Sequence, residues 1–116
     1  MKDRDRLWHI LEAIERIEKY LVYGEEQFRQ SELIQTWIVH HLQIIGEAVR
    51  MLSKSFRDAH PEVEWNKIIG MRNILVHEYF GIDSDIVWRV VNTELPNLKK
   101  KVKTFIQEVS ESKDGE

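Results

Sequence analysis

The chain of 116 residues contains no cysteine, only two prolines and only five glycines. The lack of cysteine excludes disulfides and thiolate metal sites and is usual for cytoplasmic proteins, so we expect a cytoplasmic location. Because few residues interrupt regular structure, long helices are favoured over many short strands. No apolar run is long enough to cross a bilayer, and the charged residues 1–6 show no secretion signal, so we expect no membrane association.

Basic residues are in the minority, with 17 Lys and Arg against 20 Asp and Glu and a net charge of −3. A basic surface usually accompanies RNA affinity, so composition alone favours a soluble acidic protein without a nucleic-acid partner. Two local basic runs, at residues 50–57 and 99–103, are interpreted as solvated helix faces rather than RNA tracks.

Apolar residues recur every three or four positions along most of the chain, which predicts helices. The predicted helices cover residues 4–23, 32–56, 64–80 and about 84–109. Asp3 and Ser31 are candidate N-caps, as is Asp83 or Ser84 for the last helix, and Pro96 is expected to kink or divide that helix. The predicted fold is an all-α, antiparallel bundle of four to five helices, with one domain at residues 1–110 and a polar tail at residues 111–116.

The helix predicted for residues 32–56 carries more apolar surface than the outside of a monomeric bundle requires. At about 100° per residue, a second apolar row lies roughly 80–100° from the first. Large Trp and Met side chains suit a subunit interface. We therefore predict a homodimer with Trp37, Ile44 and Met51 at or near its interface. The alternative is that this helix simply lies at the centre of the bundle.

Few residues are candidates for chemistry. The sequence has no glycine-rich phosphate loop, nucleophile elbow or zinc-binding His-Glu-x-x-His motif. The adjacent His40 and His41 cannot both face one metal from one helix, and His41 falls on the apolar row expected in the core. We predict no metal site and no other cofactor.

Residues 70–81 place Arg72, Asn73, His77 and Tyr79 among apolar residues. On a continuous helix Asn73 and His77 would be neighbours on one face, so Asn73 could orient the imidazole. Arg72 and His77 would lie about 140° apart. They would converge only if the arginine reached round, the helix were distorted or a second subunit completed the site. These considerations leave open whether the cluster is a polar site or serves capping and ion pairing.

The pattern Arg72-x4-His77-x-Tyr79 resembles the signature of the HepT family within the HEPN superfamily. Further similar blocks follow in the same order, at residues 43–48, 61–65, 69–73, 79–83, 87–88 and 95–98. An Arg-x4-His pattern alone is weakly specific, whereas the ordered series is specific. The resemblance covers about residues 5–106, nearly the whole chain.

The resemblance implies a metal-independent endoribonuclease that acts on RNA as a dimer, with Arg72 and His77 of both subunits facing a shared cleft. HepT-like toxins are encoded beside MntA-like minimal nucleotidyltransferases, the antitoxins of type VII pairs, which inactivate the toxin by adding AMP to the motif tyrosine, here Tyr79. Asn73 is a candidate supporting residue. Glu47 is another, although its spacing from the motif does not establish a role.

A second interpretation is a non-catalytic HEPN domain that binds nucleotides or docks to the nucleotidyltransferase. The acidic net charge fits it slightly better. The presence of both Arg72 and His77 favours the enzyme, because a docking domain needs neither. A purely structural helical dimer would leave the polar cluster unexplained.

Overall fold

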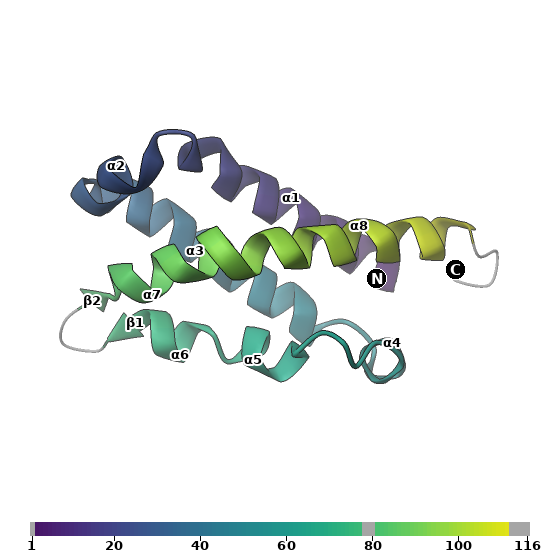
Figure 1. Cartoon of the computed structure of the whole chain (residues 1–116). Coiled ribbons are helices and arrows are strands. Elements are labelled where there is room, and N and C mark those ends of the chain that lie inside the picture. Colours follow the sequence, from purple (N-terminus) through teal and green to yellow (C-terminus); the bar gives the residue numbers. More distant parts are fainter. Residues whose placement is uncertain (1, 78–80, 112–116) are drawn as a thin grey trace.

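The computed structural model describes residues 2–77 and 81–111 (Figure 1). The helices are α1 (Asp3–Leu21), α2 (Gly24–Gln30), α3 (Glu32–Arg50), α4 (Lys54–Ala59), α5 (Trp65–Ile69), α6 (Arg72–Leu75), α7 (Ser84–Arg89), the π-helical turn η1 (Val90–Glu94) and α8 (Leu95–Glu111). Two short strands, β1 (Val76–His77) and β2 (Gly81–Ile82), pair antiparallel. The all-α prediction is confirmed, with more helix breaks than the sequence pattern predicts.

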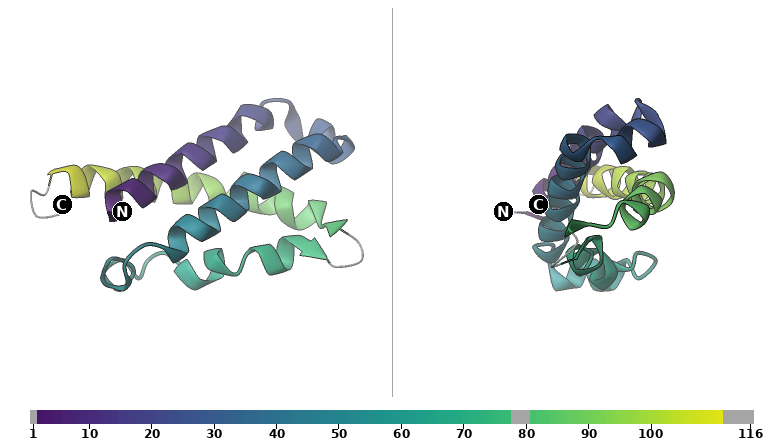
Figure 2. Two further views of the ribbon diagram at one scale, coloured as in Figure 1. Left: turned by 180° about the vertical axis from the view of Figure 1, so that it is seen from behind. Right: turned by 90° about the vertical axis from the view of Figure 1, so that its left-hand side faces the viewer.

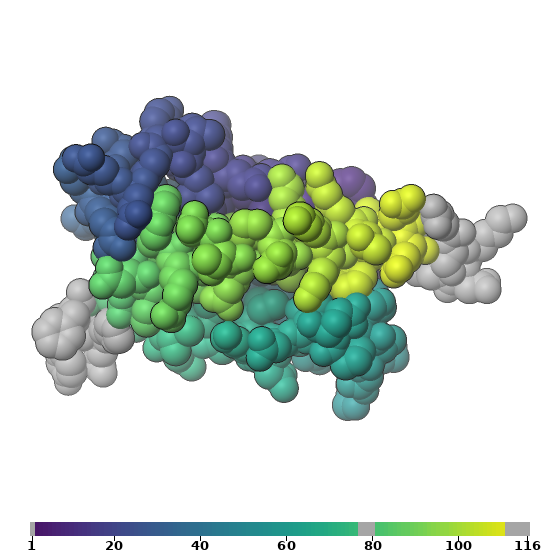
Figure 3. All heavy atoms as spheres, viewed as in Figure 1, coloured from purple at the N-terminus to yellow at the C-terminus, as the bar shows by residue number. Residues whose placement is uncertain are grey.

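The core lies among the three long helices. Helix α1 packs against α3 and α8, and α3 also packs against α5 and α6. Figure 2 shows α1 and α3 side by side, and in Figure 3 the α7–α8 segment crosses the visible face between α1 and α2 above and α4–α6 below. Residues without any exposed surface include Leu7, Ile10, Ile14, Ile17, Ile38, Leu42, Ile45, Val49 and Val102. None of the helices in the described part of the chain is long and apolar enough to cross a membrane.

The first two predicted helices need correction at their ends. Residues 25–30, expected to be a polar connection, belong to helix α2. Helix α3 ends at Arg50 instead of residue 56, because the Ser53 hydroxyl accepts the N–H of Phe56 at 3.1 Å and starts α4. The carboxylate of Asp3 does not cap α1. It accepts the backbone N–H of Ser53 at 2.8 Å and the Ser53 hydroxyl at 2.7 Å.

The helix predicted for residues 64–80 is interrupted between α5 and α6, and it is wrong at Val76 and His77. Val76 is extended, with φ −127° and ψ 122°, and begins β1. The carbonyl of Leu75 accepts the N–H of Asp83 at 2.7 Å, eight residues ahead. Gly81 takes φ +75°, a backbone conformation that L side chains rarely adopt. These features end α6 and form a two-stranded pair in which Val76 lies opposite Ile82.

The last predicted helix lies where the sequence places it, but it consists of the α-helices α7 and α8 with the π-helical turn η1 between them. Asp83 caps α7, as predicted, by accepting the N–H of Ile86. The N–H of Leu95 bonds to the carbonyl of Val90, five residues back, so the turn before Pro96 is widened. Proline lacks an N–H and its ring clashes with the carbonyl four residues earlier, which accounts for the widening. Beyond Glu111, the predicted polar tail lies outside the described residues.

Candidate functional site

Arg72 is the first residue of α6 and its side chain is exposed. It lies on a cleft of about 270 Å³ between α3 and the α5–α6 segment. From α3 the cleft is lined by Gln43, Glu47 and Arg50, among others. The cleft therefore brings the arginine of the predicted site beside polar residues about 25 positions earlier in the chain.

Gly46 permits the close approach that forms one wall of this cleft. A Cβ atom at Gly46 would lie 3.2 Å from the carbonyl oxygen of Ile68 and 3.8 Å from that of Ile69. Helix α3 can therefore pack almost backbone to backbone against the end of α5. Because Arg72 follows three residues after Ile69, this contact also sets the place of Arg72 along α3.

The structure brings Glu47 to the cleft with Arg72, where Glu47 pairs with Arg50. The two side chains form an exposed ion pair with Nη2 of Arg50 2.5 Å from Oε2 of Glu47. The hydrogen bond from Arg50 lowers the pKa of Glu47, and the charges of Arg50 and Arg6 add to that, although desolvation acts in the opposite direction. Glu47 is therefore a carboxylate at neutral pH.

The predicted helical pairing of Asn73 with His77 is wrong. Asn73 is exposed on α6, which ends at Leu75, whereas the backbone of His77 lies in β1 opposite Gly81. An extended residue advances about 3.3 Å, against about 1.5 Å in a helix, so His77 lies farther along the chain direction than helical spacing would place it. The helix is broken between Arg72 and His77, which is one of the three routes that would allow convergence, and the convergence itself stays a prediction. The side chain of His77 and all of Tyr79 lie outside the described residues.

The three predicted interface residues do not share one environment. Trp37 is half-buried within its own chain, where its indole N–H donates to the carbonyl of Arg16 at 2.9 Å and its ring meets Tyr20 edge-on at 5.4 Å. Ile44 on α3 and Met51 at its C-cap are 37% and 44% exposed. Ile44 and Met51 thus remain available to a second subunit.

His41 is the core histidine that its position in the sequence predicts. It is only 3% exposed, and its Nδ1 lies 2.8 Å from the carbonyl oxygen of Trp37. Among residues 2–77 and 81–111, no group of three or more His, Asp or Glu side chains is placed to hold a metal ion.

Sequence reasoning missed Gln43 and Arg50 as neighbours of the motif. Gly46 and Glu47 lie three and four residues after Gln43, and Arg50 lies four and three residues after them, so all four share one face of α3. The glycine within this row is the signal that could have identified the face as a close helix contact. The sequence analysis instead assigned Arg50 to a solvated basic run.

Comparison with known proteins identifies the family. A family model described as "Ribonuclease HepT-like" matches residues 10–105. The chain belongs to the ribonuclease HepT-like family. The predicted resemblance to HepT and the HEPN superfamily is thereby confirmed, and the matched segment includes residues 70–77.

Several relatives of this chain carry ribonuclease names. A protein of Caldanaerobacter subterraneus subsp. tengcongensis named "Putative RNase" is 42% identical over 105 residues, which are 90% of this chain and 94% of that protein. The "Probable ribonuclease HepT" of Thermococcus cleftensis is 37% identical over 99 residues, 84% of this chain and 90% of the relative.

A "Gamma-glutamylcyclotransferase and putative RNase" of Methanocaldococcus jannaschii is 35% identical over 108 residues, 92% of this chain but 49% of that protein, so this chain spans about half of its length. No solved structure matches the chain. The names of these relatives therefore assign ribonuclease activity to the HepT-like family.

Proposed function

We propose that this chain is the toxin of a type VII toxin–antitoxin pair, a cytoplasmic, metal-independent endoribonuclease that cleaves RNA with Arg72 and His77. The position of Arg72 carries the proposal. Its exposed side chain begins α6 on a cleft beside Arg50, and His77 follows five residues later in the adjoining strand. Membership of the ribonuclease HepT-like family supports the same activity.

The chemistry needs only groups that the RNA and the two residues supply. The guanidinium of Arg72 holds the scissile phosphate and stabilises the charge that gathers on it. The imidazole of His77 moves a proton, either from the 2′-hydroxyl or to the leaving 5′-oxygen. The 2′-oxygen attacks phosphorus as the P–O5′ bond breaks, so no metal-bound water is required. The products are a 2′,3′-cyclic phosphate and a 5′-hydroxyl.

The proposed enzyme is a homodimer. Ile44 and Met51 support this part of the proposal, because both leave apolar surface exposed, Ile44 on α3 and Met51 at its C-cap, and α3 also forms one wall of the cleft of Arg72. Exposed apolar residues of this size are typical of subunit interfaces. In such a dimer the motifs of both subunits would face one shared cleft.

The proposed partner besides RNA is a cognate MntA-like nucleotidyltransferase that acts as the antitoxin. Its target is Tyr79, two residues after His77. An AMP group there would add volume and negative charge where an RNA phosphate must bind. A nuclease inhibited in this way would keep its fold and lose access to its substrate.

The alternative function is a HEPN domain that binds nucleotides or docks to the nucleotidyltransferase without cutting RNA, which the net charge of −3 slightly favours. Purified protein incubated with RNA in the presence of EDTA distinguishes the two. The proposal expects cleavage and fragments that end in a cyclic phosphate. Intact RNA with and without added divalent ions would instead support the docking domain.

A further inference from the structure

Asp83 closes the base of the strand pair β1–β2, and the backbone of His77 belongs to β1. Its backbone N–H donates to the carbonyl of Leu75 at 2.7 Å, directly before β1. Its carboxylate accepts the N–H of Ile86 at 3.1 Å and caps α7. Because Asp83 joins β2 to α7, the contacts that fix the position of α7 also fix the position of the base of the two strands.

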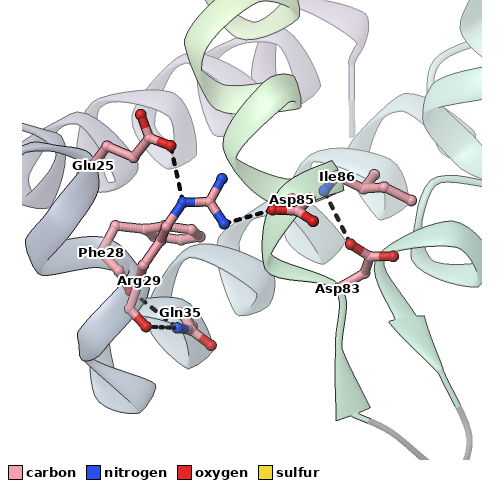
Figure 4. A network of polar contacts seen from close by, with 7 residues as sticks. All are labelled: Glu25, Phe28, Arg29, Gln35, Asp83, Asp85 and Ile86. Carbon is pink, nitrogen blue, oxygen red and sulfur yellow. Dashed lines mark hydrogen bonds and ion pairs between the residues drawn. The ribbon is translucent and has the colours of Figure 1, made fainter.

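An ion pair ties α7 to α2, which lies 56 residues earlier in the sequence. Nη1 of Arg29 is 2.5 Å from Oδ1 of Asp85, and Nε of Arg29 is 2.9 Å from Oε2 of Glu25 (Figure 4). Asp85 is the larger cause, ahead of Glu25, of a raised pKa for Arg29, so the guanidinium stays charged. Glu25 belongs to the same helix as Arg29, whereas Asp85 belongs to α7. Of these two pairs, only Arg29–Asp85 joins two elements.

Helix α2 is itself held in place. Phe28 is buried, and its ring centroid lies 5.4 Å from that of Trp88 in α7. The side-chain amide of Gln35 in α3 donates to the carbonyls of Phe28 and Arg29 at 3.0 and 3.1 Å (Figure 4). A chain of contacts thus leads from α3 through α2 and α7 to the strands.

We infer that Arg29 and Asp85 are positioning residues for the proposed RNA cleavage. Arg72 lies on a cleft whose other wall is α3. The Arg29–Asp85 pair holds α7, and with it the strand of His77, in a fixed place relative to the same helix α3. The pair thereby sets the distance between the two proposed catalytic residues. This inference rests on the proposed function.

The strands need such support because they are very short. Each contains two residues, and an isolated strand pair of this length is marginal in water. An exposed ion pair contributes little to global stability. Loss of the Arg29–Asp85 pair would therefore change mainly the local position of the two strands. Rates of enzymatic reactions are sensitive to such changes in position.

Three variants of the full chain test the inference. Arg29→Gln and Asp85→Asn each remove the charge pair between α2 and α7, and Glu25→Gln is the matched control because it removes only the partner of Arg29 within α2. We expect kcat for RNA to fall about two- to fivefold in each of the first two variants, with KM unchanged, and to stay near wild type in Glu25→Gln. The double variant should be no slower than the slower single variant.

A second measurement does not depend on catalysis. Hydrogen exchange of the Asp83 amide, which bonds to Leu75, should be faster in Arg29→Gln and Asp85→Asn and unchanged in Glu25→Gln. If wild type does not cleave RNA, the proposed function fails, and this exchange rate still decides whether the pair holds the strands. Unchanged exchange, or an equal loss of kcat in the control, would overturn the inference.

Discussion

The α-carbon of Gly46 faces the carbonyl oxygen of Ile68 so closely that an added Cβ atom would lie 3.2 Å from that oxygen. The contact joins the middle of α3 to the end of α5, and the chain reaches Arg72 four residues after Ile68. A glycine in a helix interior is ordinarily unfavourable compared with alanine, by about 0.5–1 kcal/mol. At this position the glycine allows the backbones of α3 and α5 to come into close contact, and the cleft of Arg72 depends on that contact.

Replacing Gly46 with valine should therefore harm both stability and activity. The side chain would force α3 and α5 apart, and overpacking of this kind costs about 1–3 kcal/mol. Urea unfolding measures the loss, and RNA cleavage should fall with it. Gly70→Ala is the control, because a Cβ there would make an ordinary contact at 3.5 Å with the carbonyl of Asn66. A Gly46→Val variant as stable and active as wild type would show that the close contact is dispensable.

Arg72→Ala and His77→Ala should each reduce RNA cleavage by about 10²–10⁴-fold without unfolding the chain, since each removes one group that acts in the transition state. Cleavage is followed by gel electrophoresis and the fold by circular dichroism. Arg89→Ala and His40→Ala are matched controls, since both replace exposed residues of the same types on other helices. Full activity of either motif variant, or loss of wild-type activity in EDTA, would refute the mechanism.

Helical periodicity predicts the long elements of this fold because their apolar rows are regular. The caps at Ser31 and Asp83 are confirmed, since each side chain accepts the N–H three residues ahead. The end of α3 was not predictable in the same way. Ser53 is fixed by hydrogen bonds to Asp3, which is 50 residues away in the sequence.

The candidate site was only partly predictable for a related reason. The apolar row continues through Val76, so the local pattern fits a helix up to Gly81. The strand pair arises from bonds that form only after the chain has turned, above all the one from Asp83 to Leu75. Which residues belong to the site follows from the motif, whereas their geometry depends on contacts distant in the sequence.

Ile44→Glu and Met51→Glu should convert the proposed dimer into monomers. Both side chains are exposed in the single chain, so a charge there costs little before association and much after it. Light scattering at micromolar concentration measures the state. Val22→Glu is the control, because Val22 is 79% exposed but lies beyond the end of α1. A monomeric wild type at this concentration would contradict the dimer.

Glu47→Gln should lower kcat about two- to tenfold rather than abolish cleavage, because it disturbs Arg50 at the cleft without removing a proton-transfer group. The pKa of Glu47 is lowered from 4.5, so its pairing is complete above that value and is lost only as the pH falls through the lower folded-state pKa. The ratio of wild-type to variant kcat should thus be constant between about pH 5.5 and 8. Glu12→Gln, which affects the exposed pair with Arg16 on α1, is the control. A ratio that changes within this window would mean that Glu47 itself titrates during catalysis.

Tyr79→Phe should separate regulation from catalysis. A phenol with an ordinary pKa of about 10 is a poor general base at neutral pH, so the variant should stay dimeric and retain at least part of its nuclease activity. The same variant lacks the oxygen that would receive AMP and should escape a cognate MntA-like nucleotidyltransferase. Mass spectrometry after incubation with that enzyme and ATP should show added AMP on wild type and none on Tyr79→Phe, with Tyr23→Phe, a change at an exposed tyrosine, as the control. AMP still added to Tyr79→Phe would place the modified residue elsewhere. Wild type without AMP would leave inhibition by binding as the antitoxin's mode of action, and the nuclease would then be tested by Arg72→Ala and His77→Ala alone.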